Sequence, residues 1–279
     1  MTFRLACIQT NSGGDMERNI AAASGLTREA RDGGADLIAL PEVVALIEPD
    51  RARLVATAPE EAHHPALIAF RDLAREIGAW ILGGSISVRA GDGRVANRSL
   101  LIDPTGAVAG RYDKIHMFDV DLPGGQTYRE SDTYRPGEET CVARTPWGGL
   151  GMTLCYDVRF PGLYRTLAKA GADFIAVPSA FTRQTGRAHW SVLLRARAIE
   201  TGAYVFAPAQ CGDHGGGRQT YGHTMIVDPW GAILAEAEDD IGIIFADVDT
   251  SKVADARRAI PSLGQDATYA PPPVARAAE

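Results

Sequence analysis

Short hydrophobic runs alternate with amphipathic stretches along the chain, and this pattern predicts strands separated by helices. Residues 3–10, FRLACIQT, alternate well enough for a first strand. Residues 15–34 then have the character of a helix, with Asp15 as its N-cap and two glycines as its stop. The run DLIAL at 36–40 predicts a short buried strand. The order of strand, helix and buried strand indicates an α/β protein.

The rest of the chain continues this alternation. Further helices are predicted at 66–77, 162–172 and 186–202, and strands or hairpins at 79–88, 95–103, 141–155, 173–179, 203–210, 221–237 and 242–249. A long polar loop is expected between 113 and 139. No shift in composition marks a linker, so the sequence predicts one domain over 1–265 and an extended, Pro- and Ala-rich tail over 266–279.

Two pairs of segments resemble each other across the chain. GADLIALPE at 34–42 recurs as GADFIAVPS at 171–179, and DPTGAVAG at 103–110 recurs as DPWGAILA at 228–235. One interpretation is that the chain has two similar α/β halves, whose sheets pack face to face with helices outside. The alternative is that junctions between helices and strands often look alike.

The charge and cysteine content narrow the class of protein. The 279 residues carry a net charge of −7, which argues against nucleic acid or an anionic membrane as the main partner. No apolar run approaches membrane-spanning length, and the N-terminal residues have no signal-peptide pattern. The four cysteines are far apart, which favours reduced thiols. A cytoplasmic protein is expected.

A candidate nucleophile stands in GMTLCYDVRFP at 151–161, where an apolar strand ends at Cys155 and charged residues follow. A nucleophile is well presented at a sharp turn after a buried strand. The alternative is a buried structural cysteine, since free cysteines are commonly buried. A papain-like site would need an asparagine after the cysteine, and all three asparagines precede it. HGGG at 214–217 stands alone and is interpreted as a flexible surface loop.

Two more charged residues lie just past predicted strands. Glu42 ends LIALPE, and Lys114, one of only three lysines, lies in RYDKIHMFD. Taken singly, each is more typical of a surface charge at the end of a strand. Asp119 and Asp121 are interpreted as solvated loop charges. Cys211 with His214 provides too few ligands for zinc.

Three motifs together resemble the carbon–nitrogen hydrolase family, also called the nitrilase superfamily. They are LPE at 40–42, YDKIHMFD at 112–119 and LCYDVRFP at 154–161, in this order and at these spacings. The likeness extends over nearly the whole chain. YRESDTYRPG, TGRAHWSVLLRARAIETGAYV and YGHTMIVDPWG are most similar to the branch of amidases that act on deaminated glutathione, with the omega-amidases nearby.

The resemblance implies a fold, an active site and a mechanism. The family fold is a four-layer α-β-β-α sandwich. Glu42 is expected to be the general base, Cys155 the nucleophile and Lys114 the oxyanion stabiliser together with the N–H of Tyr156. Glu130 is expected to position Lys114 or the substrate. The chemistry proceeds through a thioester and needs no metal or organic cofactor. The resemblance also suggests a homodimer or a higher homo-oligomer.

Other residues are candidates for binding the substrate. Arg159 either binds a substrate carboxylate, which the branch resemblance favours, or pairs with Asp157 or another acid. Phe181 and Thr182 either line the acyl pocket or pack within their loop. Tyr112 either reaches the pocket or packs in the core.

The predicted function is an amidase that hydrolyses a small, linear carboxylated amide, such as deaminated glutathione, and releases ammonia. Peptide bonds are not the expected substrate. The alternatives within the same chemistry are an omega-amidase acting on α-keto acid amides and a nitrilase acting on a small nitrile. A degenerate family member serving as a binding or scaffold module is the alternative outside enzymes. The presence of all four expected polar residues argues against it.

Overall fold

The first strand, β1 (Thr2–Gln9), is buried on both faces and so requires a layer on each side. Leu5 and Cys7 belong to one apolar cluster, and Ala6 and Ile8 belong to another. Successive side chains of a strand point to opposite faces, so an apolar residue at each of these positions puts the strand inside the protein.

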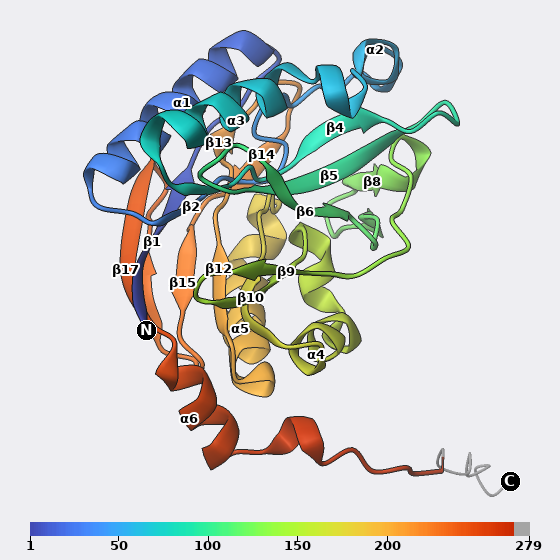
Figure 1. Ribbon diagram of the computed structural model, residues 1–279. Helices are drawn as coiled ribbons and strands as arrows, with labels where there is room; N and C mark the ends of the chain where they lie inside the picture. Colours follow the sequence, from blue (N-terminus) through green and yellow to red (C-terminus); the bar gives the residue numbers. More distant parts are fainter. Residues whose placement is uncertain (271–279) are drawn as a thin grey trace, which may run out of the picture.

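The computed structural model describes residues 1–270 and contains two large sheets (Figure 1). In order across the first sheet, the strands are β17 (Gly242–Asp249), β1, β2 (Leu37–Ala39), β3 (Trp80–Leu82), β5 (Val95–Ile102) and β4 (Ile86–Arg89), and β6 (Val108–Asp113) also pairs with β5. In the second sheet they are β16 (Ile233–Glu236), β15 (Met225–Val227), β12 (Tyr204–Ala207), β11 (Ala172–Ala176), β10 (Gly148–Met152) and β9 (Cys141–Thr145).

Each sheet has three parallel strands in its interior. In the first sheet β1, β2 and β3 are parallel, with Leu5 opposite Leu37 and Leu37 opposite Trp80. In the second sheet β10, β11 and β12 are parallel, with Leu150 opposite Phe174. The outer pairings of both sheets are antiparallel. The two halves suggested by the repeated segments therefore each contain three parallel strands.

Helices cover the outer face of each sheet (Figure 1). α1 (Met16–Asp32) and α3 (Pro65–Ile77) pack on the first sheet, and α4 (Pro161–Lys169) and α5 (Arg183–Thr201) pack on the second. The other helical segments are α2 (Arg51–Thr57), α6 (Ser251–Ala259), η1 (Glu61–His63), η2 (Glu130–Asp132), η3 (Cys155–Arg159) and η4 (Ser262–Gly264).

Three apolar clusters fill the spaces between the four layers. One joins α1 and α3 to the first sheet, the second lies between the sheets, and the third joins the second sheet to α4 and α5. Phe70, Phe174 and Trp190 are fully buried representatives of the three clusters. The predicted α-β-β-α sandwich is confirmed.

Most elements lie where the hydrophobic pattern predicts them. The helix predicted at 15–34 is α1, and the side chain of Asp15 accepts a hydrogen bond from the N–H of Arg18 at 3.0 Å. The prediction of an uninterrupted loop at 113–139 is wrong. That segment contains η2 and a hairpin of β7 (Asp119–Asp121) and β8 (Thr127–Arg129), whose charged side chains hid the strand pattern. The predicted tail, 266–279, lies outside the described residues from 271 onward.

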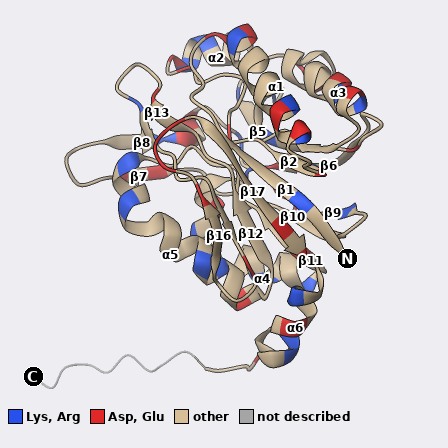
Figure 2. Cartoon of the chain, turned by 90° about the vertical axis from the view of Figure 1, so that its left-hand side faces the viewer, with Lys and Arg blue, Asp and Glu red and all other residues tan. Residues whose placement is uncertain are grey.

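Charged side chains of both signs are interspersed along the outer helices α1, α3 and α6 (Figure 2). Arg28 on α1 donates two hydrogen bonds to the Glu76 carboxylate on α3, at 2.6 and 2.8 Å, and so links the two helices. Among residues 1–270, no helix has both the length and the apolar character needed to cross a bilayer.

Candidate active site

The candidate catalytic residues come from the ends of strands that lie close together. Glu42 follows β2, Lys114 directly follows β6, and Cys155 follows β10. Ligand sites in α/β sheets form at the carboxyl ends of parallel strands. At the end of β2 the chain passes very close to Gly84, whose φ is 61°, and a Cβ there would overlap the carbonyl oxygen of Pro41.

The Glu42 carboxylate is 3% exposed and has hydrogen bonds to both oxygens. Oε1 accepts from Lys114 Nζ at 3.0 Å and from Asn97 Nδ2 at 2.9 Å, and Oε2 accepts from the N–H of Ala180 at 2.8 Å. Burial alone would raise the pKa of this carboxyl, but the positive charge and hydrogen bond of Lys114 outweigh burial and lower it. Glu42 is therefore ionised at neutral pH.

The Lys114 ammonium lies between two carboxylates. Besides the contact with Glu42, its Nζ donates to Glu130 Oε1 at 2.8 Å and to Oε2 at 2.9 Å. Glu130 Oε2 also accepts from the N–H of Phe118 at 2.6 Å, which holds the acid in place. Burial would lower the pKa of Lys114, but the charges of Glu130 and Glu42 raise it well above its ordinary value. The ammonium therefore stays charged.

Cys155 occupies a sharp turn. Its φ of 45° lies in the left-handed region, which is unusual for a residue with a side chain, and its N–H donates to the carbonyl of Pro178 at 3.0 Å. Burial, followed by the charge of Glu42, raises the pKa of the thiol well above its ordinary value. The sulfur is therefore a protonated thiol at rest, and a nucleophilic role would require a base to remove its proton.

One buried carboxylate joins the segment of Lys114 to the turn of Cys155. Asp157 Oδ2 accepts from the N–H of Leu154 at 2.9 Å and from the Tyr112 hydroxyl at 2.6 Å. Its Oδ1 accepts from the N–H of His116 at 3.1 Å and lies 2.7 Å from His116 Nδ1. Asp157 thus spans the two segments, and Arg159 is not among its partners.

Tyr112 is a correction to the predicted substrate site. Its ring belongs to the apolar cluster between the sheets, its side chain is buried, and its hydroxyl is bound to Asp157. It does not line the cavity at the strand ends. The sequence alternatives for this residue are settled in favour of the core.

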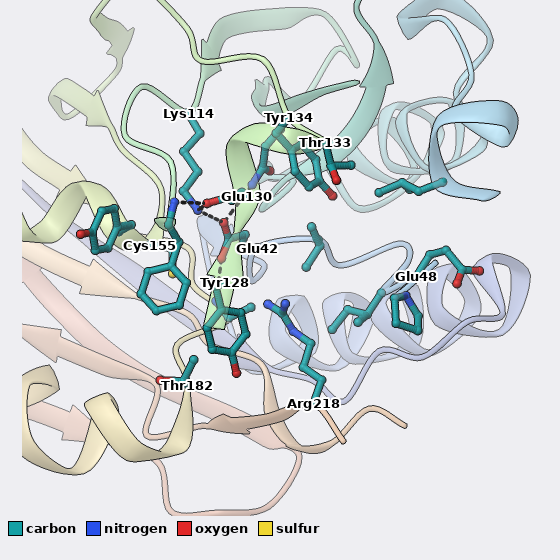
Figure 3. A pocket seen from close by; sticks show the side chains of 18 of the residues that line it. Glu42, Glu48, Lys114, Tyr128, Glu130, Thr133, Tyr134, Cys155, Thr182 and Arg218 are labelled. Carbon is teal, nitrogen blue, oxygen red and sulfur yellow. Dashed lines mark hydrogen bonds and ion pairs between the residues drawn. The ribbon is translucent and has the colours of Figure 1, made fainter. Parts of the chain in front are cut away.

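A cavity of about 220 Å³ opens over the strand ends (Figure 3). The predicted residues that line it are Glu42, Lys114, Glu130, Cys155, Tyr156, Phe181 and Thr182. Arg159 is not part of the lining. Its guanidinium lies over the rings of Tyr156 and Phe181, 5.7 and 5.2 Å from their centres, and contacts His189 Nδ1 at 3.3 Å.

Asn97 and Arg218 are among the polar residues of the cavity that the sequence analysis missed. Asn97 lies on β5, where an amide at a buried strand position was the available signal. Arg218 follows HGGG, and the interpretation of that motif as a flexible surface loop was wrong for His214, which is buried and hydrogen-bonded on both ring nitrogens.

The other polar clusters singled out in the sequence have local partners. Asp121 pairs with Arg129 at 2.8 Å, and Asp119 accepts from the N–H of Ser131. Within the described part of the chain, no three His, Cys, Asp or Glu side chains are grouped as ligands for a metal ion.

Comparison with known proteins identifies the family. The model of the carbon–nitrogen hydrolase family matches residues 4–258. This chain belongs to the carbon–nitrogen hydrolase family. It is therefore an enzyme that hydrolyses carbon–nitrogen bonds, as the sequence motifs predicted.

The relatives include amidases from bacteria and animals. A deaminated glutathione amidase of Yersinia enterocolitica is 41% identical, over 93% of this chain and 91% of the relative. An omega-amidase of Bos taurus is 34% identical, over 95% of each chain. The crystal structure of the NitFhit protein of C. elegans has a TM-score of 0.87 and 36% identity, over 95% of this chain and 65% of that one.

Proposed function

We propose that this enzyme is an amidase in which Cys155 attacks the carbonyl carbon of a small carboxylated amide, with deaminated glutathione as the candidate substrate. The supporting observation is the cavity that Glu42, Lys114, Glu130 and Cys155 line together, with the lysine ammonium held between the two carboxylates. The deaminated glutathione amidase from Yersinia, similar over nearly its whole length, supports the choice of substrate.

In the first half of the reaction, the thiol proton passes to Glu42 while the Cys155 sulfur bonds to the carbonyl carbon. The carbonyl oxygen becomes an oxyanion next to the Lys114 ammonium. The N–H of Tyr156 donates no hydrogen bond to any of the described residues, so it is available as a second donor. When the tetrahedral intermediate collapses, the carbon–nitrogen bond breaks, Glu42 returns the proton to the leaving nitrogen, and a thioester remains.

In the second half, Glu42 takes a proton from water, whose oxygen attacks the thioester. The carbon–sulfur bond breaks, the carboxylic acid leaves and Cys155 recovers its proton. Glu130 contributes by holding Lys114 in position. The predicted release of ammonia is right only for a primary amide. Deaminated glutathione has a secondary amide, so its hydrolysis releases the amino group of cysteinylglycine instead.

The side chains around the reacting groups suggest how the acyl group is held. Phe181 and Thr182 line the cavity and would contact the acyl chain. Arg159 lies against two aromatic rings that border the cavity, and its role in binding a substrate carboxylate stays a prediction.

A cytoplasmic homo-oligomer, with residues 1–265 as one domain, is the proposed context for this activity. β17, near the end of this domain, pairs with β1 at its beginning, and so joins the two ends of the domain in one sheet. Val192 and Ile199 are exposed two turns apart on α5, and Trp230 is exposed as well, which fits a second copy covering them. Light scattering of the purified protein tests the oligomeric state.

The test of the proposed function compares substrates side by side. Deaminated glutathione is assayed by release of cysteinylglycine, and α-ketoglutaramate and a small nitrile by release of ammonia, with Cys155→Ala as the blank. We expect the fastest turnover on deaminated glutathione and a loss of about 10⁴-fold or more in Cys155→Ala, as when a covalent nucleophile is removed.

Each other outcome has a clear meaning. Full activity in Cys155→Ala would overturn the mechanism. A preference for α-ketoglutaramate would make the protein an omega-amidase, and turnover of the nitrile alone would make it a nitrilase. The thermal unfolding temperature of Cys155→Ala shows whether the variant is folded.

A further inference from the structure

The cavity contains a positive charge that the proposed chemistry does not use. Of the cations in its lining, Lys114 is held by two acids, Arg129 pairs with Asp121, and Arg51 is exposed to solvent. Arg218 is only partly exposed and forms no ion pair with any residue from 1 to 270. Its Nε is buried and has no hydrogen-bond partner. A buried N–H of this kind normally has an acceptor, so a bound ligand is the natural source of one.

A hairpin that is anchored to the rest of the protein holds Arg218 beside the cavity. The strands β13 (Cys211–Asp213) and β14 (Gln219–Tyr221) are joined by a loop that ends at Arg218. His214 Nδ1 donates to the carbonyl of Ser12 at 2.7 Å, and its Nε2 accepts from the Thr220 hydroxyl at 2.6 Å. Burial lowers the pKa of His214, which keeps the ring neutral for these two bonds. The loop is therefore fixed at its base.

The side chain of Arg218 extends from this loop into the cavity (Figure 3). Its charge acts on the catalytic centre, because it is one of the groups that lower the pKa of Glu42. It also lowers the pKa of Tyr134, although burial raises that pKa overall. Arg218 is thus close enough to influence a molecule bound at the reacting groups.

The charge of the catalytic centre explains why such a cation is needed. Glu42 and Glu130 are two negative charges around the single positive charge of Lys114, so the centre carries one net negative charge. An anionic substrate is repelled by this centre, and the repulsion is strong in a partly buried site. A guanidinium on the cavity wall offsets it. Its planar set of donors also matches the two oxygens of a carboxylate.

We propose that Arg218 is the anion-binding residue of the cavity and holds a carboxylate of the substrate that is remote from the amide being hydrolysed. The inference rests on the amidase function proposed above and adds to it the residue that recognises the ionised carboxyl group of the substrate. Arg159 lies outside the cavity lining and against aromatic rings, so Arg218 is better placed for this contact.

The test uses two primary amides that differ only at the remote end: glutaramate, which ends in a carboxylate, and pentanamide, which ends in a methyl group. Ammonia release is measured for the wild type, Arg218→Gln and Arg218→Lys. In Arg218→Gln we expect KM for glutaramate to rise about 10- to 100-fold more than KM for pentanamide. Arg218→Lys should recover part of the loss, because it keeps the charge without the planar fork.

A binding measurement makes the test independent of turnover. Glutarate is titrated into Cys155→Ala and into the double variant Cys155→Ala/Arg218→Gln. The Kd for glutarate should be at least about tenfold higher in the double variant. Arg94→Gln is the matched control: the same exchange on an exposed turn, where the arginine pairs with Asp92.

The outcomes separate this inference from the proposed function. Equal losses on glutaramate and pentanamide, with the acid limb of the pH profile moved upward for both, would show that Arg218 acts only through Glu42 and would overturn the inference. Equal affinity for glutarate in the two Cys155→Ala backgrounds would overturn it as well. A wild-type enzyme that hydrolyses no amide at all would instead overturn the proposed function.

Discussion

Two strand ends, one in each half of the protein, share a backbone plan and differ in what they contribute. β2 and β11 each follow a helix through the sequence Gly-Ala-Asp, and each is the middle one of three parallel strands. Each strand is also followed by a proline. The next residue is Glu42 in the first half and Ser179 in the second.

The two ends meet at the candidate active site, where one supplies a carboxylate and the other supplies a hydrogen bond to it. Glu42 directs its carboxylate to Lys114, whereas the Ser179 hydroxyl turns back to the carbonyl of Val177 at 2.8 Å. The N–H of Ala180 donates to Glu42 at 2.8 Å. The comparison teaches that a repeated backbone can bring two strand ends together, while a single residue type decides which of them carries the ionised side chain of the candidate site.

The sharpest way to break this comparison is to remove the acid at the first strand end. Glu42→Gln keeps the size of the side chain but cannot accept the thiol proton, so kcat/KM should fall about 10²- to 10⁴-fold. Steady-state kinetics on the preferred amide measure the loss, and circular dichroism checks the fold. Retention of more than a tenth of the wild-type rate would contradict the role of general base.

A second change tests the carboxylate that joins the two halves. Asp157→Asn puts an amide NH₂ where one of the Asp157 oxygens accepts two hydrogen bonds, so it disturbs the Lys114 segment, the Cys155 turn or both. We expect a loss of about 2–4 kcal/mol in unfolding free energy, since two buried or partly buried groups lose their acceptor.

Urea unfolding measures the stability of Asp157→Asn, and kcat should fall as well because the Cys155 turn is displaced. Tyr112→Phe is the matched comparison. It removes one of the hydrogen bonds to Asp157 and the longer one from the N–H of Ile115 to the hydroxyl, and it should cost about 1–2 kcal/mol. If Tyr112→Phe lowered the unfolding free energy by more than Asp157→Asn did, Asp157 would not be the residue that joins the two segments.

The pH dependence of stability gives a smaller effect. The pKa of Glu42 is lower in the folded protein than its ordinary value of 4.5, so ionised Glu42 stabilises the fold above that pH. This contribution is lost as the pH falls through the folded-state pKa. Urea unfolding above and below pH 4.5 should therefore show that the unfolding free energy falls more steeply with decreasing pH in the wild type than in Glu42→Gln. Parallel curves for the two proteins would refute the coupling to Lys114.

The smallest effect is expected at the matching position of the second half. Ser179→Ala removes the hydrogen bond to Val177 and should cost about 0.5–1.5 kcal/mol in unfolding free energy. The rate on the preferred amide should stay within about twofold of the wild type, because the hydroxyl points away from the reacting groups. A drop in rate comparable to that of Glu42→Gln would erase the distinction between the two strand ends.

Local patterns were enough to predict many of the elements. α1 has its N-cap at Asp15, and the buried runs that became β2 and β11 were read directly from their apolar residues. The pattern failed where charged residues form a strand, as in β7, and where a strand pairs with a distant partner. β17 was predicted as a strand, but its place beside β1 depends on contacts made across the whole chain.

The sequence by itself determined the strand and helix pattern and, through three spaced motifs, the resemblance to the family, because these are properties of the chain order. The resemblance in turn implied the four-layer fold and the candidate triad. The tertiary structure decided which side chains face the cavity. The Tyr112 hydroxyl binds Asp157 and does not line the cavity, and Arg159 lies against aromatic rings. Arg218 enters the cavity from a hairpin that is distant in the sequence. These directions follow from packing and hydrogen bonds between segments far apart in the chain, and no local pattern encodes such contacts.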